Sequence, residues 1–548
     1  MKIRLISAMF IMAMIVLIPV AESATAGKKQ VVVLEFSEFE WSQITTNHPK
    51  LLNLLKTSST GLVKLPAREN VPPDLPVTCE SYANSSIGFY EDLVSRIFAE
   101  TDFYTTLLLV YSRRSPEIGN GLTPVLIKGT GFKGGVLYSP STRKRGIVTY
   151  NDLRSTILRF LNPEKTKTVF RIRSMPGDWR ILAQSRDGLI KNYTIRWPLL
   201  TGYFYLLLGV IILIIIGLCF HFRPRIITGL AWAYLLLITA PGAFLLEALI
   251  DPVELPSILF WTLGISGIMF LWSYFSSRKN ITRALAMISL ITTVLVIING
   301  LLNGYYECKS FLGYSVVTGG RYYGIGNEYM GVLLGASIAG LSSLLPALKH
   351  RCREILWFVT FIIGLVLIHP NFGADVGGGI AALMGLGVTN YLWLKKPIQI
   401  KEISRLCLMT LGALVLAGAW DLYANRDCMS HLGQLLLSVS NHGPGVVGSM
   451  ALRKISLNLR LIGSTPLTLV LIGILLVMPV FYRFPPAPLQ RVMDKHPEAI
   501  AGLAGLAVTA LIGFLVNDSG IVSAAMTFMF GIGLGLTVVI KELDRAKE

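Results

Sequence analysis

The chain has 548 residues, of which 53% are hydrophobic and only 15% are charged, and its mean hydropathy is +0.59. Soluble globular chains carry about 25% charged residues, so the composition excludes an assembly of soluble domains. Several apolar runs reach the roughly 20 residues that a helix needs to cross a bilayer. The sequence therefore predicts a polytopic membrane protein. Its formal net charge of +18 is of the kind that membrane topology produces, and we expect no nucleic-acid partner.

The first 26 residues have the pattern of a secretory signal peptide. Lys2 and Arg4 precede an apolar stretch from Ile6 to Val20, and Ala24-Thr25-Ala26 provides small residues for cleavage after Ala26. An uncleaved first membrane helix is the alternative. Either arrangement places the chain from residue 27 onward outside the cytoplasm.

Residues 27–197 are predicted to form an extracytoplasmic α/β domain. Residues 28–197 hold 24 Lys and Arg against 15 Asp and Glu, without a run long enough to span a membrane. Buried strands are expected at 30–36, 106–111 and 123–127, and helices at 51–55 and 150–161. Strands that alternate with helices indicate layered α/β packing.

The segment from Leu122 to Leu153, which contains "TPVLIKGTGF" and "SPSTRKRGIVTYNDL", resembles the C-terminal part of alkaline phosphatase and sulfatase superfamily domains. Residues 31–41 and 49–65 are similar to the first strand and helix of that fold. The resemblance implies a truncated alkaline phosphatase fold.

The superfamily's chemistry uses two metal ions held by Asp and His residues, together with a Ser or Thr nucleophile. The domain has one histidine, His48, and its first strand reads Glu35-Phe36-Ser37-Glu38 where a metal-binding Asp is usual. Two-metal catalysis needs several such ligands close together. We therefore expect a degenerate pseudoenzyme domain with no metal and no cofactor, and a residual hydrolase is the alternative.

Residues 198–548 are predicted to form a multi-spanning helical domain, because only helices satisfy the backbone of such apolar segments within a bilayer. Inner connections hold 18 Lys and Arg and outer connections hold six, which follows the positive-inside rule with the C-terminus in the cytoplasm. The expected protein is a multi-pass cell-membrane protein in contact with membrane lipids. Its eleven predicted spans are 199–220, 226–247, 257–275, 281–302, 327–347, 355–369, 376–394, 405–424, 464–482, 498–516 and 519–540.

Four polar, glycine-rich segments fall on the outer side in this topology: 319–331, 369–379, 420–433 and 517–520. Ionisable groups at membrane depth are costly and usually face a cavity or one another. The sequence thus predicts a polar cavity that opens outward, and interfacial turns with snorkelling charges are the alternative. The acids are Glu328, Asp375, Asp421 and Asp518, with Arg321, Arg426 and His431 as expected partners.

The same segments, "RYYGIGNE", "GADVGG", "SHLG" and "NDSG", resemble a family of uncharacterised bacterial membrane proteins. A weaker resemblance is to O-antigen ligases and polymerases of the bacterial cell envelope. It rests on Arg321–Asn327 and on His431 followed by Gly445-Val-Val-Gly448. Glu328 stands where that pattern has Pro-Asn, and Leu432 where it has Asn or Ser.

Two function classes remain open. The first is a glycan ligase or transferase acting on a polyprenyl-diphosphate-linked substrate, with Glu328, Asp421 or His431 as general base. The second is a non-enzymatic transporter or envelope assembly factor. The residues expected to bind substrate are Arg321, Asn327, Asp375, Arg453, Lys454, Asn517 and Asp518.

The long connection 425–463 could hold a lipid diphosphate through its basic residues, or it could form a helix that only packs on the headgroups. Cys308 and Cys428 both fall outside the cytoplasm, where a disulfide is permitted. Whether they pair is left open by the sequence.

The topology makes a prediction about accessibility. Single cysteines placed at Asn280 or His350 are expected to stay unlabelled by an impermeant thiol reagent in intact cells, because both lie in inner connections. Cys308 in its outer connection is the matched positive control. Labelling at 280 or 350 from outside would contradict the topology.

Overall fold

The structure is a computed structural model, and its described residues form two units. The first comprises the described residues up to Ser139 and from Arg145 to Ala183, and the second comprises Pro140–Lys144 and the described residues from Gln184 onward. The signal peptide, Arg426, Cys428 and, apart from Thr468, the 464–482 span lie outside the described residues. These are 29–38, 44, 47–64, 77–82, 91–93, 96–97, 101–114, 121–163, 172–347, 354–394, 398–425, 429–443, 445–462, 468 and 495–545.

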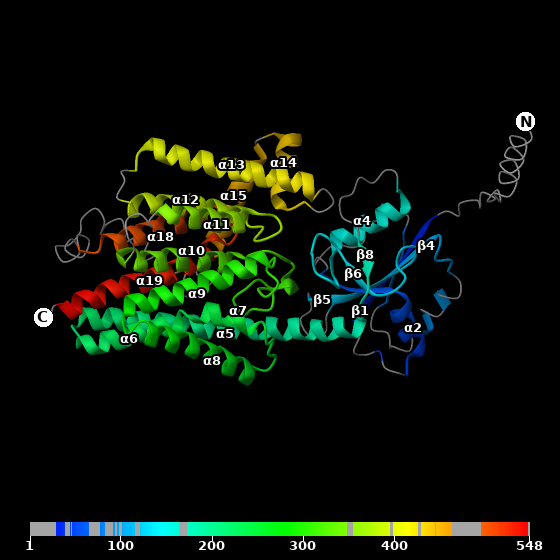
Figure 1. Cartoon of the computed structure of the whole chain (residues 1–548). Helices are drawn as coiled ribbons and strands as arrows, with labels where there is room; N and C mark the ends of the chain where they lie inside the picture. The colour runs from blue at the N-terminus through cyan, green and yellow to red at the C-terminus, as the bar shows by residue number, and fades with distance from the viewer. Residues whose placement is uncertain are drawn as a thin grey trace, which may run out of the picture. The chain divides into compact units, whose positions relative to one another are not determined.

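A mixed sheet forms the centre of the first unit, with strand order β3-β1-β4-β5-β2-β6-β8 and with β7 paired to β2 (Figure 1). β1 lies between β3 and β4 and is parallel to both, with Leu34 opposite Val110. The apolar run of β1 fits this central position, because a parallel strand is covered on both faces. The strands are β1 Gln30–Glu38, β2 Ser59–Lys64, β3 Val77–Tyr82, β4 Thr106–Arg114, β5 Leu122–Lys128, β6 Val136–Tyr138, β7 Ile147–Thr149 and β8 Arg173–Met175.

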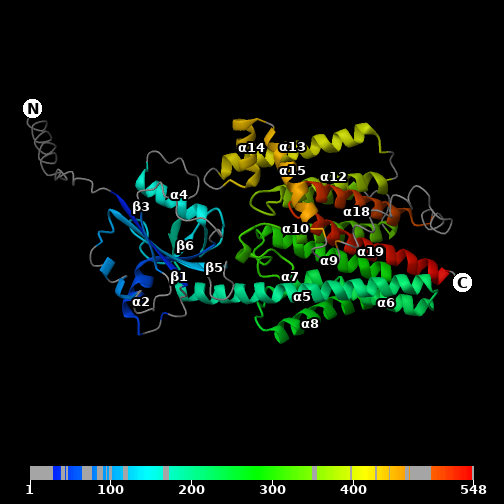
Figure 2. The same cartoon turned by 180° about the vertical axis from the view of Figure 1, so that it is seen from behind.

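Two helices cover the sheet. α4, Tyr150–Leu161, begins with a capping box in which Thr149 and Asp152 each accept a hydrogen bond from the other's backbone N–H. It packs Leu153 and Ile157 against Val31 and Val33 of β1. α2, Pro49–Thr57, lies on the other side of the sheet in Figures 1 and 2. The strands and helices predicted for this region are confirmed, and its sheet contains antiparallel as well as parallel pairs.

The second unit is a bundle of helices. Every predicted span that falls on described residues lies on helix, the 226–247 span on α6 and α7 together. Seven helical stretches among the described residues, with α6 and α7 counted as one, are long and apolar enough to cross a membrane, and the count of eleven stays a prediction. Such helices indicate a membrane protein. Their bounds are α5 Trp179–Cys219, α6 Pro224–Leu237, α7 Ala240–Glu247, α8 Leu255–Ser276, α9 Ile281–Leu301, α10 Asn327–Leu344, α11 Ile355–Ile368, α12 Val376–Trp393, α13 Ile400–Ala424, α14 His431–His442, α15 Gly445–Arg460, α18 Pro497–Val516 and α19 Gly520–Arg545.

The helix α5 runs for 41 residues without a break, with Pro198 inside it. The predicted domain boundary at 197/198 therefore falls within a helix, and the division by contacts lies earlier, between Ala183 and Gln184. The predicted boundary lies where hydropathy rises, and that point marks only the start of the apolar part of α5. The polar first turns of α5 continue the same hydrogen-bonded ladder, so the change in composition is not a change in structure.

The central helices α12 and α18 lie side by side (Figure 2), and small residues allow their close approach. A Cβ on Gly385 of α12 would lie 2.1 Å from Thr509 Oγ1 of α18, and a Cβ on Gly505 of α18 would lie 1.9 Å from Thr389 Oγ1 of α12. These reciprocal glycine–threonine contacts are the small-residue packing that membrane helices use to approach closely.

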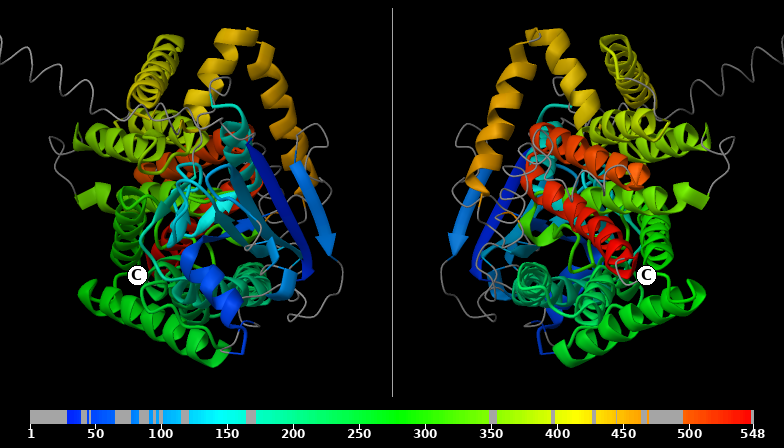
Figure 3. Two further views of the ribbon diagram at one scale, coloured as in Figure 1. Left: turned by 90° about the vertical axis from the view of Figure 1, so that its right-hand side faces the viewer. Right: turned by 90° about the vertical axis from the view of Figure 1, so that its left-hand side faces the viewer.

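The helix α10 is buried along almost its whole length and packs in the same way on α19. Figure 3 shows α18 and α19, in orange and red, side by side. A Cβ on Gly335 of α10 would lie 2.6 Å from the carbonyl oxygen of Thr527, and the Thr527 hydroxyl donates to the Gly331 carbonyl at 3.2 Å.

Replacing Gly335 with leucine is expected to destabilise the bundle by about 1–3 kcal/mol or more, because the new side chain would meet backbone atoms of α19 that cannot move alone. Gly264→Leu is the matched control, since Gly264 on α8 is exposed and has nothing within 4 Å of its Cβ position. Thermal unfolding of both variants in detergent measures the difference. Equal melting temperatures would contradict the packing argument.

Candidate functional site

The connection between α9 and α10 is held by a buried carboxyl group. Glu307 is 0% exposed, and its Oε1 accepts from the Gly326 N–H at 2.6 Å while Oε2 accepts from Asn299 Nδ2 at 3.1 Å. Burial raises the pKa of Glu307 to about 8, although these hydrogen bonds and the Arg321 charge oppose the rise. Gly326 is the N-cap of α10, so Glu307 fixes the point where this helix begins.

Segments 319–331 and 369–379 meet through their backbones. The Ile325 N–H donates to the Gly373 carbonyl at 2.7 Å. Gly324 has a φ of 80°, and a Cβ there would lie 2.1 Å from the same carbonyl oxygen. Glycine is required at this position because any side chain would both strain the backbone and separate the two segments.

The start of α10 also contacts segment 517–520. Asn327 Nδ2 donates to Ser519 Oγ at 2.5 Å. Glu328, in the first turn of α10, lies 3.6 Å from Arg196 of α5. The guanidinium of Arg321 donates to the Ile325 carbonyl just before the helix. The polar residues predicted at this helix entry thus contact two other elements.

Asp375 and Asn517 lie where α12 begins and α18 ends. Asp375 is the N-cap of α12 and accepts from the Gly378 N–H at 3.0 Å, while its other oxygen is buried without a hydrogen bond to a described residue. Asn517 is the C-cap of α18, and its Oδ1 would be 2.1 Å from a Cβ on Gly377. Gly377 therefore allows segments 369–379 and 517–520 to touch.

Asp421 organises segment 420–433. It is 0% exposed and accepts from the Ser430 N–H at 2.7 Å, the Ser430 hydroxyl at 2.8 Å and the Gly433 N–H at 3.1 Å. Asn425 donates to Asp421 at 2.8 Å and to Asn371 of segment 369–379 at 3.3 Å. This carboxylate thereby sets the position of His431, the first residue of α14.

His431 lies among the charges of the other segments. Its pKa is lowered, first because surrounding protein atoms displace water from the ring and then because Arg321, Lys454 and Arg453 place positive charge nearby; Asp518 acts in the opposite direction. Part of the residue stays exposed to solvent. We call this group the cationic cluster, because its bases outnumber its one acid. Its members are Arg321, His431, Arg453, Lys454 and Asp518.

Residues of α15 attach the cluster to the bundle. Lys454 Nζ donates to the Val516 carbonyl at 2.5 Å, and Arg453 lies 3.9 Å from Asp518. Asn458 is fully buried: it donates to the Asn517 carbonyl at 2.7 Å and accepts from the Ile521 N–H at 3.0 Å. The long connection thus contains a helix that is bonded to the α18–α19 turn rather than only resting on headgroups.

The four predicted segments therefore come together at one end of the helical unit, as expected, and all ten predicted site residues belong to this group. Sequence reasoning missed Glu307, Asn299 and Asn458. Glu307 and Asn299 carried a signal, since they flank the end of an apolar helix. Asn458 did not, because an asparagine in an amphipathic helix reads as a surface residue.

Two further expectations concern the pairing of Cys308 with Cys428 and metal binding. Cys308 forms no disulfide with a described residue and accepts a hydrogen bond from Lys144 at 3.2 Å. Cys428 lies outside the described residues, so whether the two cysteines pair stays open. Within the part of the chain that the structure describes, no three His, Cys, Asp or Glu residues are grouped as a metal site would need. Glu35 accepts from the Tyr111 hydroxyl at 2.8 Å inside the sheet unit.

Comparison with known proteins gave no matching family model, no matching curated protein and no matching solved structure.

The Glu307 carboxyl predicts a pH dependence of stability. Its folded pKa of about 8 exceeds the ordinary 4.5, so the folded state holds the proton more tightly and its contribution to stability falls as pH rises from about 4.5 to 8. Glu307→Gln loses one acceptor but cannot ionise. The free energy of unfolding of the wild type is expected to exceed that of this variant by about 1–3 kcal/mol at pH 5.5. The difference is expected to be smaller at pH 8.5.

Thermal unfolding in detergent at both pH values measures the effect. Glu254→Gln, at an exposed carboxyl before α8, is the control and should leave the pH dependence unchanged. Parallel pH curves for the wild type and Glu307→Gln would contradict the assignment.

Proposed function

We propose that the helical unit is a glycan ligase or transferase that binds a polyprenyl-diphosphate-linked donor at the cationic cluster. The observation that carries this proposal is that the positive charges of Arg321, Arg453 and Lys454 act on His431, with Arg453 and Lys454 on the helix that is bonded to the α18–α19 turn. Arginine and lysine side chains are the groups that proteins use to bind phosphate. A cluster of three of them around a histidine combines anion binding with a proton acceptor.

The lowered pKa of His431 supports the role of general base. At neutral pH its imidazole is neutral, so a ring nitrogen can accept a proton. In the proposed reaction, an acceptor hydroxyl loses its proton to His431 and its oxygen forms a bond to the anomeric carbon of the glycan. The bond between that carbon and the diphosphate breaks, and the polyprenyl diphosphate leaves with the electron pair.

The remaining polar residues bind the substrate or orient His431. Arg321, Arg453 and Lys454 hold the diphosphate and offset the negative charge that grows on it as it leaves. Asp421 is hydrogen-bonded to Ser430 and Gly433 on either side of His431, so it orients the base through the backbone. Glu328, Asn327, Asp375, Asn517 and Asp518 complete the proposed polar cavity.

The proposed setting is the bacterial cell envelope. After signal cleavage, the sheet unit and the cationic cluster would lie outside the cytoplasm and the C-terminus inside, supported by the 18-to-six division of basic residues between loops. The sheet unit is proposed as a degenerate alkaline phosphatase-like domain. Its support is that β1, α2, β5 and the start of α4 fall on the segments that carry the resemblance.

A transporter is the second candidate, and one observation favours it. Glu307 is buried, hydrogen-bonded and has a pKa of about 8, which makes it able to take up and release a proton. An ion-coupled transporter would use such a group, whereas the proposed transfer reaction needs it only to hold α10.

The test compares His431→Gln with His442→Gln in a strain that lacks the native gene. Both histidines belong to α14 and have exposed surface, but only His431 lies in the cationic cluster. His431→Gln is expected to reduce glycan transfer by about 100-fold or more, the range for loss of a general base. Lipid-linked glycan should accumulate, while protein levels and the His442→Gln profile stay normal.

Arg321→Gln should raise the donor concentration needed for half-maximal transfer, because it removes diphosphate binding. Full complementation by His431→Gln, with an unchanged lipid-linked glycan profile, would overturn the proposal. Loss of solute uptake in the Glu307→Gln variant, without any change in glycans, would favour the transporter.

A further inference from the structure

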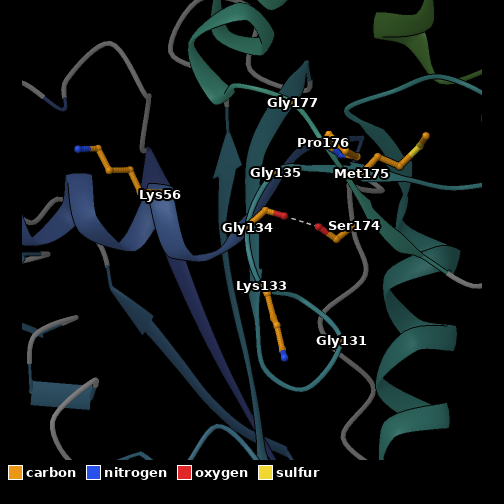
Figure 4. A pocket seen from close by; sticks show the side chains of 9 residues that line it. All are labelled: Lys56, Gly131, Lys133, Gly134, Gly135, Ser174, Met175, Pro176 and Gly177. Atoms are coloured by element: carbon orange, nitrogen blue, oxygen red, sulfur yellow. Dashed lines mark hydrogen bonds between the residues drawn. The ribbon is translucent and has the colours of Figure 1, made fainter.

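The sheet unit has a hollow of about 570 Å³ beside the loop that joins β5 to β6. Figure 4 shows the glycine-rich loop running past Ser174, with Lys56 from α2 and Lys133 from the loop at the rim. Both ammonium groups point away from the hydrogen bond between Gly134 and Ser174. Their charges therefore lie at the rim of the hollow, in different directions, rather than converge on one point.

A second hollow of about 530 Å³ adjoins the first, and Gly131 and Ser174 line both. Its positive groups are Lys29, Arg159 at the end of α4 and Arg173 of β8. Two aromatic rings with exposed surface, those of Tyr104 and Phe160, also line it, and the ring of Phe132 is buried beneath. Lys29 Nζ lies 5.6 Å from the centre of the Phe160 ring, so a cation and an aromatic face stand together.

All the charged side chains that line the two hollows are positive. Five lysine and arginine side chains line them, and no aspartate or glutamate does. All five are exposed, and none forms an ion pair with a described residue. Positive groups gathered without acidic partners raise the local concentration of anions.

The loop between the hollows is held in one shape. The Gly134 carbonyl accepts from the Ser59 hydroxyl at 3.2 Å, and the Gly135 carbonyl accepts from the Thr60 N–H at 3.0 Å. Gly135 has a φ of 88°, and a Cβ there would lie 2.2 Å from the Met175 carbonyl oxygen. A ligand therefore meets a preformed surface, which lowers the entropy cost of binding.

We propose that these adjoining hollows bind an anionic glycan chain, with its acidic groups at the five cations and sugar faces on the rings of Tyr104 and Phe160. Aromatic side chains offer flat apolar surfaces, on which the C–H face of a sugar ring can lie. The cations are spread along two hollows, which matches a polymer with charges at intervals rather than a single phosphate. This site is separate from the cationic cluster of the helical unit and does not depend on its function.

The test uses the full chain in nanodiscs of neutral phosphatidylcholine, with hexagalacturonate as the anionic probe. Maltohexaose controls for a neutral glycan and inorganic phosphate for charge alone. Titration is expected to show hexagalacturonate binding at least 10-fold tighter than either control, and weaker binding at high salt because the pairs are exposed.

Arg159→Gln is expected to weaken hexagalacturonate binding about 10-fold. Arg154→Gln is the matched control, because Arg154 is exposed on the same helix but lines neither hollow. Equal binding of maltohexaose, equal binding of phosphate, or equal effects of the two substitutions would overturn the proposal. Binding to phosphatidylglycerol vesicles but not to hexagalacturonate would also overturn it, in favour of a lipid surface.

Discussion

The side chain of Glu307 accepts a hydrogen bond from the N–H of Gly326, the residue at which α10 is capped. α10 is buried along most of its length and touches α9, α12, α18 and α19. Its starting point and rotation therefore decide which side chains face each of these neighbours. If the cap moved, the glycine contacts with α19 and the Asn327 bond to Ser519 would lose their register together.

The acidic and basic groups at this end of the bundle have different roles because their burial differs. Asp375, Asp421 and Glu307 are buried and accept hydrogen bonds from backbone N–H groups, so they hold loops and helix starts in place. Arg453 and Asp518 are more than half exposed. Buried charges are costly unless hydrogen-bonded, so these three buried acids serve the architecture, whereas the exposed Arg453 can also meet a ligand.

The same separation occurs in the sheet unit. Glu35 and Asp152 are buried and hydrogen-bonded, whereas the lysines and arginines around the glycine-rich loop are exposed. In both units these buried acids are used inside the fold, whereas the bases named at the two sites are at least partly exposed. Both proposals made for this chain involve anionic ligands for that reason.

The sequence alone determined the membrane class, the positions of the helices and the main strands, and the gathering of the four polar segments. Each follows from a local pattern, namely an apolar run of a given length, an alternation of strands and helices, or the parity of loops across a bilayer. Only the tertiary structure decided that α5 continues through the expected domain boundary, that Gly505 faces Thr389, and that Glu307 and Asn458 are buried anchors. These facts depend on which helix faces lie against one another. That choice is set by close contacts between residues far apart in the chain, and no periodicity along the chain records it.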